Sequence, residues 1–538
     1  FPNGVSDDAL ANLRAAREQI DEIVCTTIHG FCQAMIRPYP VEARMDPGAK
    51  IIDPAEAEIV YGELFDQWLR VRFDGQGQDD DVLVEMLSQW GDGAVERIRQ
   101  IADVLRRNRT ARPPAAEVSL DDAEALRAAV AAWRAWYDGQ PLDEPESRAI
   151  VEEFKVAVDR VGQVLANGAH AAALVELAEP QRLSCMHKDK FSFSAYRRKG
   201  KWEGAAKAAG LPKIEGERHN AAAMEHYEAC CDAFTAFFGQ VSAALLHRFA
   251  AEFAELTRMY ADRKRAAALL DFDDLIYKAL DVLSRNADVR DALSERFRHI
   301  LVDEFQDTDP LQCEIFWRLA GTPPAAEPDA RWSRWLLRPG QLFLVGDPKQ
   351  SIYRFRGADV HAYLEARDAI STSAPDSILR ITHNFRSLQP ILDWVNARFE
   401  VPIQAQDLEF QPLTGTEDPR PGSQRVVALD VAIDGDSPKS EDLREGEAAA
   451  VADLCRRLIG ELEVRDKDGF RPCQAGDIAL LAPSGTDLYV YERQLELRDV
   501  PIASQAGKGF FRRQEVQDLI AITRVLADAR DTLALGAL

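Results

Sequence analysis

The chain has no cysteines in metal-binding or redox spacing. Its 538 residues contain eight cysteines, none of which forms a Cys-x-x-Cys pair, and no histidine cluster lies near them. A zinc or iron–sulfur site is therefore not expected. No secretory signal opens the sequence, which predicts a reducing, cytoplasmic setting. The cysteines are Cys25, Cys32, Cys185, Cys230, Cys231, Cys313, Cys455 and Cys473.

Long apolar runs and a surplus of positive charge are missing as well. No stretch of about 18 uninterrupted apolar residues occurs, so we expect no transmembrane helix and no membrane partner. Acidic residues outnumber basic ones by 89 to 65, for a net charge of −24. This balance argues against nucleic-acid binding by the whole surface and confines any such site to a local patch. The length predicts about three to four domains.

The residue pattern changes along the chain. From about 55 to 270 it is rich in Ala, Leu, Glu and Arg with helical spacing, which predicts a long helical region. From about 298, short apolar runs end in polar clusters and alternate with helical stretches, which predicts an α/β fold with parallel sheets. The predicted helices cover 7–20, 55–69, 151–165, 310–319 and 390–399, and the predicted strands cover 299–302, 342–345, 378–382, 426–433 and 477–482.

The segment 297–312, FRHILVDEFQDTDPLQ, brings two adjacent carboxylates to the end of a buried strand. In a nucleotide hydrolase, the first carboxylate of such a pair, here Asp303, holds Mg²⁺. The second, here Glu304, polarises the attacking water as a general base. The alternative is a pair of solvated loop acids.

A second segment, LFLVGDPKQSIYRFRGAD at 342–359, places a tight turn after another strand. Gln350 then stands where a glutamine can sense a γ-phosphate or position water. Tyr353, Phe355 and Arg356 belong to an alternating aromatic and cationic run, which suits stacking on unpaired bases with phosphate contacts nearby. The alternative is an amphipathic edge segment with a core aromatic.

A third segment, ITHNFRS at 381–387, presents Arg386 after a predicted strand. An arginine aimed at a phosphate from a neighbouring domain acts as an arginine finger. The alternative is a surface arginine paired with a carboxylate.

Together these segments resemble motifs II, III and IV of the UvrD/Rep-type superfamily 1 helicases. The remaining matches lie in the family's order: TTIHGFC at 26–32, LLDFDDLI at 269–276 and GKGFFRRQEVQDLI at 507–520. TIHGFCQAMI and the long helical insertion are most similar to the RecB/AddA branch, the motor subunits of helicase–nucleases that process double-strand breaks.

This resemblance implies functions and partners. The chain would act as an ATP-dependent 3′→5′ helicase on single-stranded DNA and duplex DNA ends, with ATP and Mg²⁺ as cofactors and an AddB-type nuclease partner. Asp303 would bind Mg²⁺, Glu304 would be the base, and Gln350 and Arg386 would contact the γ-phosphate. Phe355 would stack on a base. The other residues expected near the DNA path are Tyr353, Arg356, Thr27 and His29.

The resemblance also implies a domain organisation. The first motor domain, with a RecA-like fold, would comprise 1–36 and 266–385, interrupted by an all-helical insertion at 37–265. The second motor domain would begin at 386. No Gly-x-x-x-x-Gly-Lys-Ser/Thr phosphate loop occurs in the 538 residues. We therefore expect a fragment that begins after this loop and ends within the second motor domain, with a catalytically inactive DNA-binding scaffold as the alternative.

The helical insertion contains one basic and aromatic island, HKDKFSFSAYRRKGKW at 187–202. Basic side chains neutralise phosphates and aromatic rings can stack on bases. The alternative is a solvated loop above buried aromatics. The cations singled out as candidate DNA contacts are Arg197, Arg198, Lys199 and Lys201.

Overall fold

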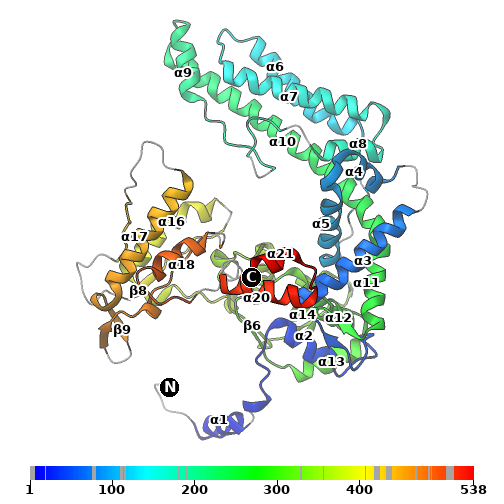
Figure 1. The fold of residues 1–538 in the computed structure, drawn as a ribbon, viewed down its shortest axis with the longest axis vertical. Helices are drawn as coiled ribbons and strands as arrows, with labels where there is room; N and C mark the ends of the chain where they lie inside the picture. The colour runs from blue at the N-terminus through cyan, green and yellow to red at the C-terminus, as the bar shows by residue number, and fades with distance from the viewer. Residues whose placement is uncertain are drawn as a thin grey trace. The chain divides into compact units, whose positions relative to one another are not determined.

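The computed structural model divides the chain into two compact units, Phe1–Leu379 and Arg380–Leu538 (Figure 1). Each unit has apolar clusters of its own. The domain ranges expected from the sequence stay a prediction. The structure describes residues 6–538 except 19, 75–79, 110–112, 114, 116, 180–181, 188–190, 328–329, 355–356, 406–407, 417–424, 432–438, 467–468, 483–484, 486 and 504–513.

Much of the first unit is a set of helices around one large apolar core, which we call the helical arm. The predicted helices at 55–69 and 151–165 are confirmed, since both stretches are helical with apolar residues facing this core. The helices of the arm are α3 (Pro54–Asp74), α4 (Val82–Trp90), α5 (Ala94–Arg107), α6 (Glu124–Asp138), α7 (Pro145–Val164), α8 (Ala171–Ala178), α9 (Lys199–Ala208), α10 (Lys213–Glu252) and α11 (Ala254–Ala266).

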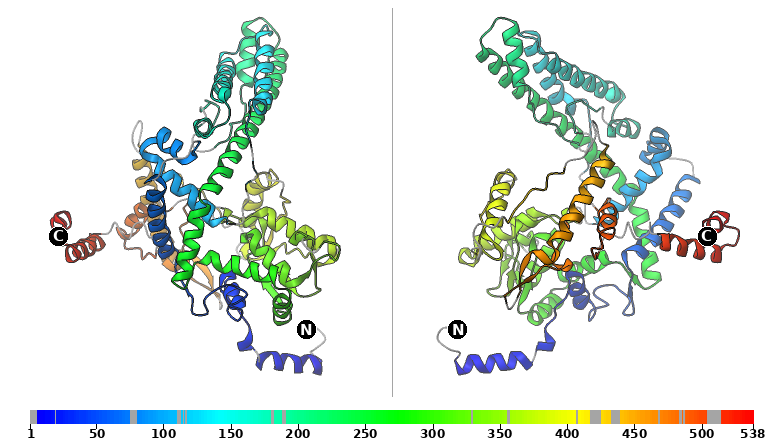
Figure 2. Two further views of the ribbon diagram at one scale, coloured as in Figure 1. Left: turned by 90° about the vertical axis from the view of Figure 1, so that its right-hand side faces the viewer. Right: turned by 60° about the vertical axis from the view of Figure 1, so that its left-hand side comes forward.

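Helix α10 is the spine of the arm. It packs against α6, α8 and α9, and Figure 2 shows α6 and α7 running beside it. Its length and apolar composition would also allow it to cross a membrane, a test that core helices pass equally well. Its aromatic side chains lie in the arm core, where Phe234 meets Phe154 edge to face and Phe238 at 4.4 Å between ring centroids. These contacts assign α10 to a packed core.

The rest of the first unit is an α/β part with a second core. Strand β3 (Ile300–Val302) pairs in parallel with β6 (Leu342–Leu344), and β1 (Lys50–Ile51) pairs in parallel with β2 (Leu269–Leu270). The strands predicted at 299–302 and 342–345 are thus confirmed. Beside these strands lie α1 (Asp7–Glu18), α2 (Ile28–Ile36), α12 (Phe272–Arg285), α13 (Ala287–Arg296), α14 (Pro310–Ala320), α15 (Val360–Ser373) and the antiparallel pair β4 (Gly321–Thr322) and β5 (Leu336–Leu337).

The second unit contains fewer strands than the sequence predicted. No strand forms at 378–382, 425–431 or 477–482 within the described residues, so the three strands predicted there are wrong as far as the structure describes them. Leu379 is 80% and Leu481 is 90% exposed; apolar runs with high strand propensity stay unpaired when no neighbouring strand buries them. The elements are β7 (His383–Leu388), α16 (Gln389–Gln404), β8 (Thr414–Thr416), α17 (Ser440–Glu461), β9 (Glu463–Asp466), β10 (Gly469–Pro472), α18 (Leu488–Glu496), α20 (Gln514–Ala527) and α21 (Thr532–Ala537).

A buried ionic joint connects the helical arm to the α/β part. Lys264 of α11 donates to Asp271 at 2.7 Å and to Asp274 at 2.6 Å. Arg109, which follows α5, pairs with the same two carboxylates, and the Tyr260 hydroxyl donates to Asp271. The two acids also cap the start of α12 reciprocally. Two cations thus balance two carboxylates that lie in the interior.

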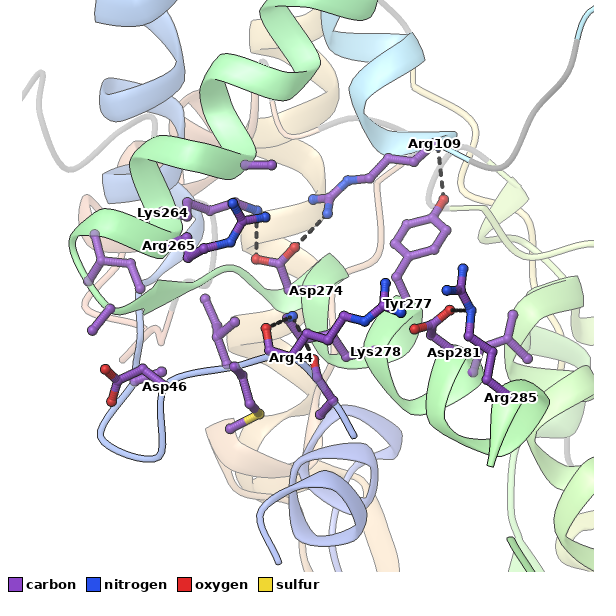
Figure 3. Close-up of a pocket in the computed structure, with 18 of the residues that line it drawn as sticks. Arg44, Asp46, Arg109, Lys264, Arg265, Asp274, Tyr277, Lys278, Asp281 and Arg285 are labelled. Carbon is purple, nitrogen blue, oxygen red and sulfur yellow. Dashed lines mark hydrogen bonds and ion pairs between the residues drawn. The ribbon is translucent and has the colours of Figure 1, made fainter. Parts of the chain in front are cut away.

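A cavity of about 580 Å³ lies beside this joint (Figure 3). Lys278 projects along its wall and donates to the carbonyls of Ala43 at 3.0 Å and Arg44 at 3.1 Å. Arg285 pairs with Asp281 on the same wall. The lining residues include none of the side chains that the sequence analysis assigned to a site.

We predict that Lys264→Met destabilises the first unit by about 3–5 kcal/mol, because it leaves two buried carboxylates with a single cation. Burial opposes ionisation of Asp271, but Arg109 and Lys264 hold its pKa below the ordinary value. Its contribution is therefore complete above about pH 4 and falls as the pH drops below that. Urea unfolding measures both effects. Arg265→Met, on the exposed side of the same helix, is the control and should cost less than about 1 kcal/mol; an equal loss in both variants would contradict the joint.

Candidate functional site

The acidic pair lies directly after β3. Asp303 and Glu304 are both exposed, and Glu304 has left-handed backbone angles, φ 50° and ψ 40°. Such angles are uncommon for a residue with a side chain and concentrate at functional turns. The next residue, Phe305, is buried and its N–H donates to the Val345 carbonyl at 2.9 Å. The chain therefore reverses sharply at Glu304 and is held there by a core aromatic.

One polar network joins the loop after β3 to the loop after β6. Gln306, 2% exposed, donates to Glu304 Oε2 at 2.7 Å and accepts from the Asp347 N–H at 2.9 Å. The Asp347 carboxylate accepts from Gln350 Nε2 at 3.1 Å and pairs with Lys349 Nζ at 3.0 Å. The structure thus brings the predicted residues Glu304 and Gln350 into one network. The linking residue, Gln306, was missed although it stands inside DEFQD.

The oxygen atoms of this edge suit a divalent cation. Burial, with a further effect of Glu304, raises the pKa of Asp307, and its Oδ1 atom is buried without a hydrogen-bond partner among the described residues. Asp303 is exposed two residues before the turn that carries Asp307. Carboxylate oxygens are the ligands that Mg²⁺ prefers, so these residues fit the ion.

The predicted DNA-contact residues fall into two groups. Thr27 is the N-cap of α2, where its side chain accepts from the Gly30 N–H at 3.3 Å, and His29 meets the ring of Phe272 edge to face at 5.5 Å. Burial lowers the pKa of His29 against an opposing effect of Asp273. Tyr353 is half-buried. Phe355 and Arg356 lie outside the described residues, as does 507–513 of the last motif. Whether any of them touches DNA stays a prediction.

Arg386 belongs to the second unit. It lies in β7, at an irregularity in the pairing with β8 between Asn384 and Leu388. Asn384 Oδ1 accepts from the backbone N–H groups of Arg386 at 2.9 Å and Ser387 at 2.7 Å, which fixes this short kink. The Arg386 side chain is exposed. Its assignment to the phosphate remains a prediction.

The basic island separates into a buried aromatic half and a cationic surface half. Trp202 is fully buried and donates to the Tyr196 hydroxyl at 2.9 Å, and Phe193 stacks on Phe154 of α7. The described aromatics therefore belong to the arm core. Lys188 and Lys190 lie outside the described residues.

The cations of the island lie among glutamates. Glu146 pairs with both Arg198 at 2.6 Å and Lys201 at 2.7 Å, and Lys199 pairs with Glu217 at 3.1 Å. Arg197 is exposed. Exposed pairs of this kind contribute about 0–1 kcal/mol, so a phosphate can compete for the same cations.

Comparison with known proteins identifies the class of this fold. Residues 6–371 match the UvrD/REP helicase N-terminal domain, and residues 379–538 match the UvrD-like helicase C-terminal domain. These matches imply a RecA-like α/β fold, with which the parallel strand pairs agree. The chain belongs to the UvrD/REP helicase family, and the resemblance predicted from its motifs is confirmed.

Individual relatives share one name, that of the AddA subunit of the ATP-dependent helicase/nuclease. The chain is 24% identical to this protein of Listeria innocua and 23% identical to that of Exiguobacterium sibiricum; these matches cover 95% and 96% of the chain. It is 30% identical to that of Staphylococcus epidermidis over 51% of the chain. The first two matches span 44% of each relative, so the chain corresponds to less than half of their length.

Proposed function

We propose that this chain forms part of the motor of an ATP-dependent DNA helicase that moves 3′→5′ along single-stranded DNA within a double-strand-break repair helicase–nuclease. The network that runs from Glu304 through Gln306 and Asp347 to Gln350 is the observation that supports this most strongly. It joins a carboxylate suited to general-base chemistry to an amide suited to a γ-phosphate. The names of the relatives support the same function and an AddB-type partner.

In this proposal each residue has one task in hydrolysis. Glu304 accepts the proton of the attacking water as its oxygen bonds to the γ-phosphorus and the bond to the ADP oxygen breaks. Gln350 and Arg386 bind the γ-phosphate oxygens, where a guanidinium offsets charge that develops in the transition state. Asp303 would hold Mg²⁺, which when bound neutralises phosphate charge.

The proposed DNA track uses the aromatic and cationic run after Gln350. Phe355 stacks on an unpaired base, and Tyr353, Arg356, Thr27 and His29 lie along the strand. The cations of the arm island bind the phosphates of a duplex end. Closure of the cleft between two motor domains would then move the strand across Phe355.

A second function, DNA binding without hydrolysis, is favoured by one feature of the 538 residues: they contain no Gly-x-x-x-x-Gly-Lys-Ser/Thr loop. That loop supplies the backbone N–H cradle and the lysine for the β- and γ-phosphates.

We predict that the 538-residue polypeptide alone hydrolyses little ATP, because these phosphate contacts are missing from it. A steady-state assay with saturating single-stranded DNA checks this, with Glu304→Gln of the same polypeptide as the measure of contaminating activity. Turnover above that background at about 1 s⁻¹ or faster, the usual range of enzymes, would contradict the prediction.

We predict opposite behaviour for two substitutions in a full-length protein that joins this chain to a phosphate loop. Glu304→Gln should retain ATP binding and lose hydrolysis, because the amide preserves shape but cannot accept the proton. Arg386→Ala should lower turnover by roughly 10³-fold or more if the arginine is a finger. Arg380→Ala is the matched control: Arg380 is exposed in the same unit and paired with Glu409 at 2.6 Å, so its loss should leave turnover unchanged. Wild-type turnover in either test variant would refute its role.

We predict that the two DNA sites respond to different substrates. Phe355→Ala should weaken single-strand affinity by roughly 1–3 kcal/mol, the worth of one base–aromatic stack. Neutralising Arg197, Arg198, Lys199 and Lys201 together should instead weaken duplex-end binding, and the slope of log K against log salt should flatten by about 0.9 for each phosphate that is no longer neutralised. Affinities measured across a salt series on both substrates decide this.

A matched variant separates binding from a general charge effect in the arm. Glu146→Gln releases Arg198 and Lys201 from their shared acid without removing a cation. Duplex affinity should therefore rise in this variant and fall in the fourfold variant. An unchanged salt slope on both substrates would return the island to a solvated surface over buried aromatics.

A further inference from the structure

Gln306 is a buried amide with both ends occupied. The backbone N–H of Asp347 can only donate, so the atom of Gln306 that faces it at 2.9 Å must be the oxygen. The amide nitrogen then faces Glu304 Oε2 at 2.7 Å and donates to it. This orientation is fixed by the partners themselves, and it leaves the carboxylate of Glu304 held from the direction of the loop after β6.

The loop after β6 is packed tightly onto this amide. A Cβ atom at Gly346 would lie 3.0 Å from Gln306 Oε1 and 3.1 Å from the Gln306 backbone nitrogen, so only glycine fits there without displacement. Ser351 Oγ donates to the Gln306 carbonyl at 3.2 Å. Residues 346–351 therefore contact Gln306 at both their first and last members, and a shift of the loop must move the amide.

We propose that Gln306 is a positioning residue that transmits the conformation of the 346–351 loop to the carboxylate of Glu304. The inference rests on the proposed function, in which Gln350 binds phosphate and the run that follows it binds DNA. When that run engages a strand, the loop shifts, the Asp347 N–H moves, and the rigid planar amide carries the movement to Glu304 Oε2. Glu304 is exposed, so this charge-assisted hydrogen bond is what selects its orientation toward the attacking water.

Two substitutions divide the two ends of the amide. Gln306→Glu keeps an oxygen that can accept from Asp347 but loses the donor to Glu304. Gln306→Met has a similar volume and loses both. In the full-length protein, we expect each variant to lower the kcat of DNA-stimulated ATP hydrolysis by roughly 10- to 100-fold, since a misplacement of about 1 Å can cost that much. The KM for ATP should stay within about threefold, because neither end of the amide is assigned to the nucleotide.

Gln341 provides the matched control. It is also a buried glutamine of the same core, and its amide donates to the carbonyls of Ser294 and Phe297 at 3.0 Å, away from both loops. Gln341→Met should therefore cost stability but leave kcat and the stimulation by DNA unchanged. Equal kcat in Gln306→Met and Gln341→Met would show that Gln306 merely packs, and would overturn the inference.

Failure of the proposed function gives a different result. If the wild-type full-length protein shows no DNA-stimulated hydrolysis, the function is wrong, and the contact itself is then tested by stability. Gln306→Met and Glu304→Ala, alone and together, should shift the urea midpoint non-additively, because each removes one half of the same hydrogen bond. Additive shifts would overturn the positioning contact whatever the activity.

Discussion

The parallel pairing of β3 with β6 is the constraint on which the candidate site depends. Ile300 lies opposite Leu342 and Val302 opposite Leu344, so the two strands end at the same edge. Polar loops that follow parallel strands then emerge side by side, as in other open α/β sheets. A shift of this register by one residue would turn Val302 out of the core and would separate Gln306 from the Asp347 N–H. The chemistry of the acidic loop thus follows from a strand pairing of three residues on each side.

The second constraint is the ionic joint at the start of α12. Asp271 and Asp274 cap that helix and also hold Lys264 and Arg109, so the same carboxylates set the helix start and attach the arm. Phe272, between them in sequence, meets His29 of α2. An apolar joint of the same volume could match its stability, but it would lack the fixed directions of these hydrogen bonds. Direction matters here because a long helical arm amplifies any rotation at its base.

The sequence predicted the helices and the order of the motifs well, because amphipathic spacing and loop chemistry are local properties. Helices α3 and α14 and strands β3 and β6 were found in this way. The strands predicted around Leu379 and Leu481 were not, since an apolar run becomes a strand only where another strand pairs with it. Gln306 was missed for a related reason. Its importance lies in the hydrogen bond that it accepts from the Asp347 N–H, 41 residues away in sequence, and no local pattern marks that bond.

Charge explains why the arm island can be both paired and available. On a chain with a net charge of −24, a cluster of cations without acids would be an exception, and Glu146 and Glu217 accordingly lie beside it. Each exposed pair is worth little, whereas a phosphate backbone brings a line of charges and releases condensed counterions when it binds. Exchange of glutamate for phosphate therefore becomes favourable only for a ligand that meets several of these cations together. An extended nucleic-acid backbone meets that condition, and a single small anion does not.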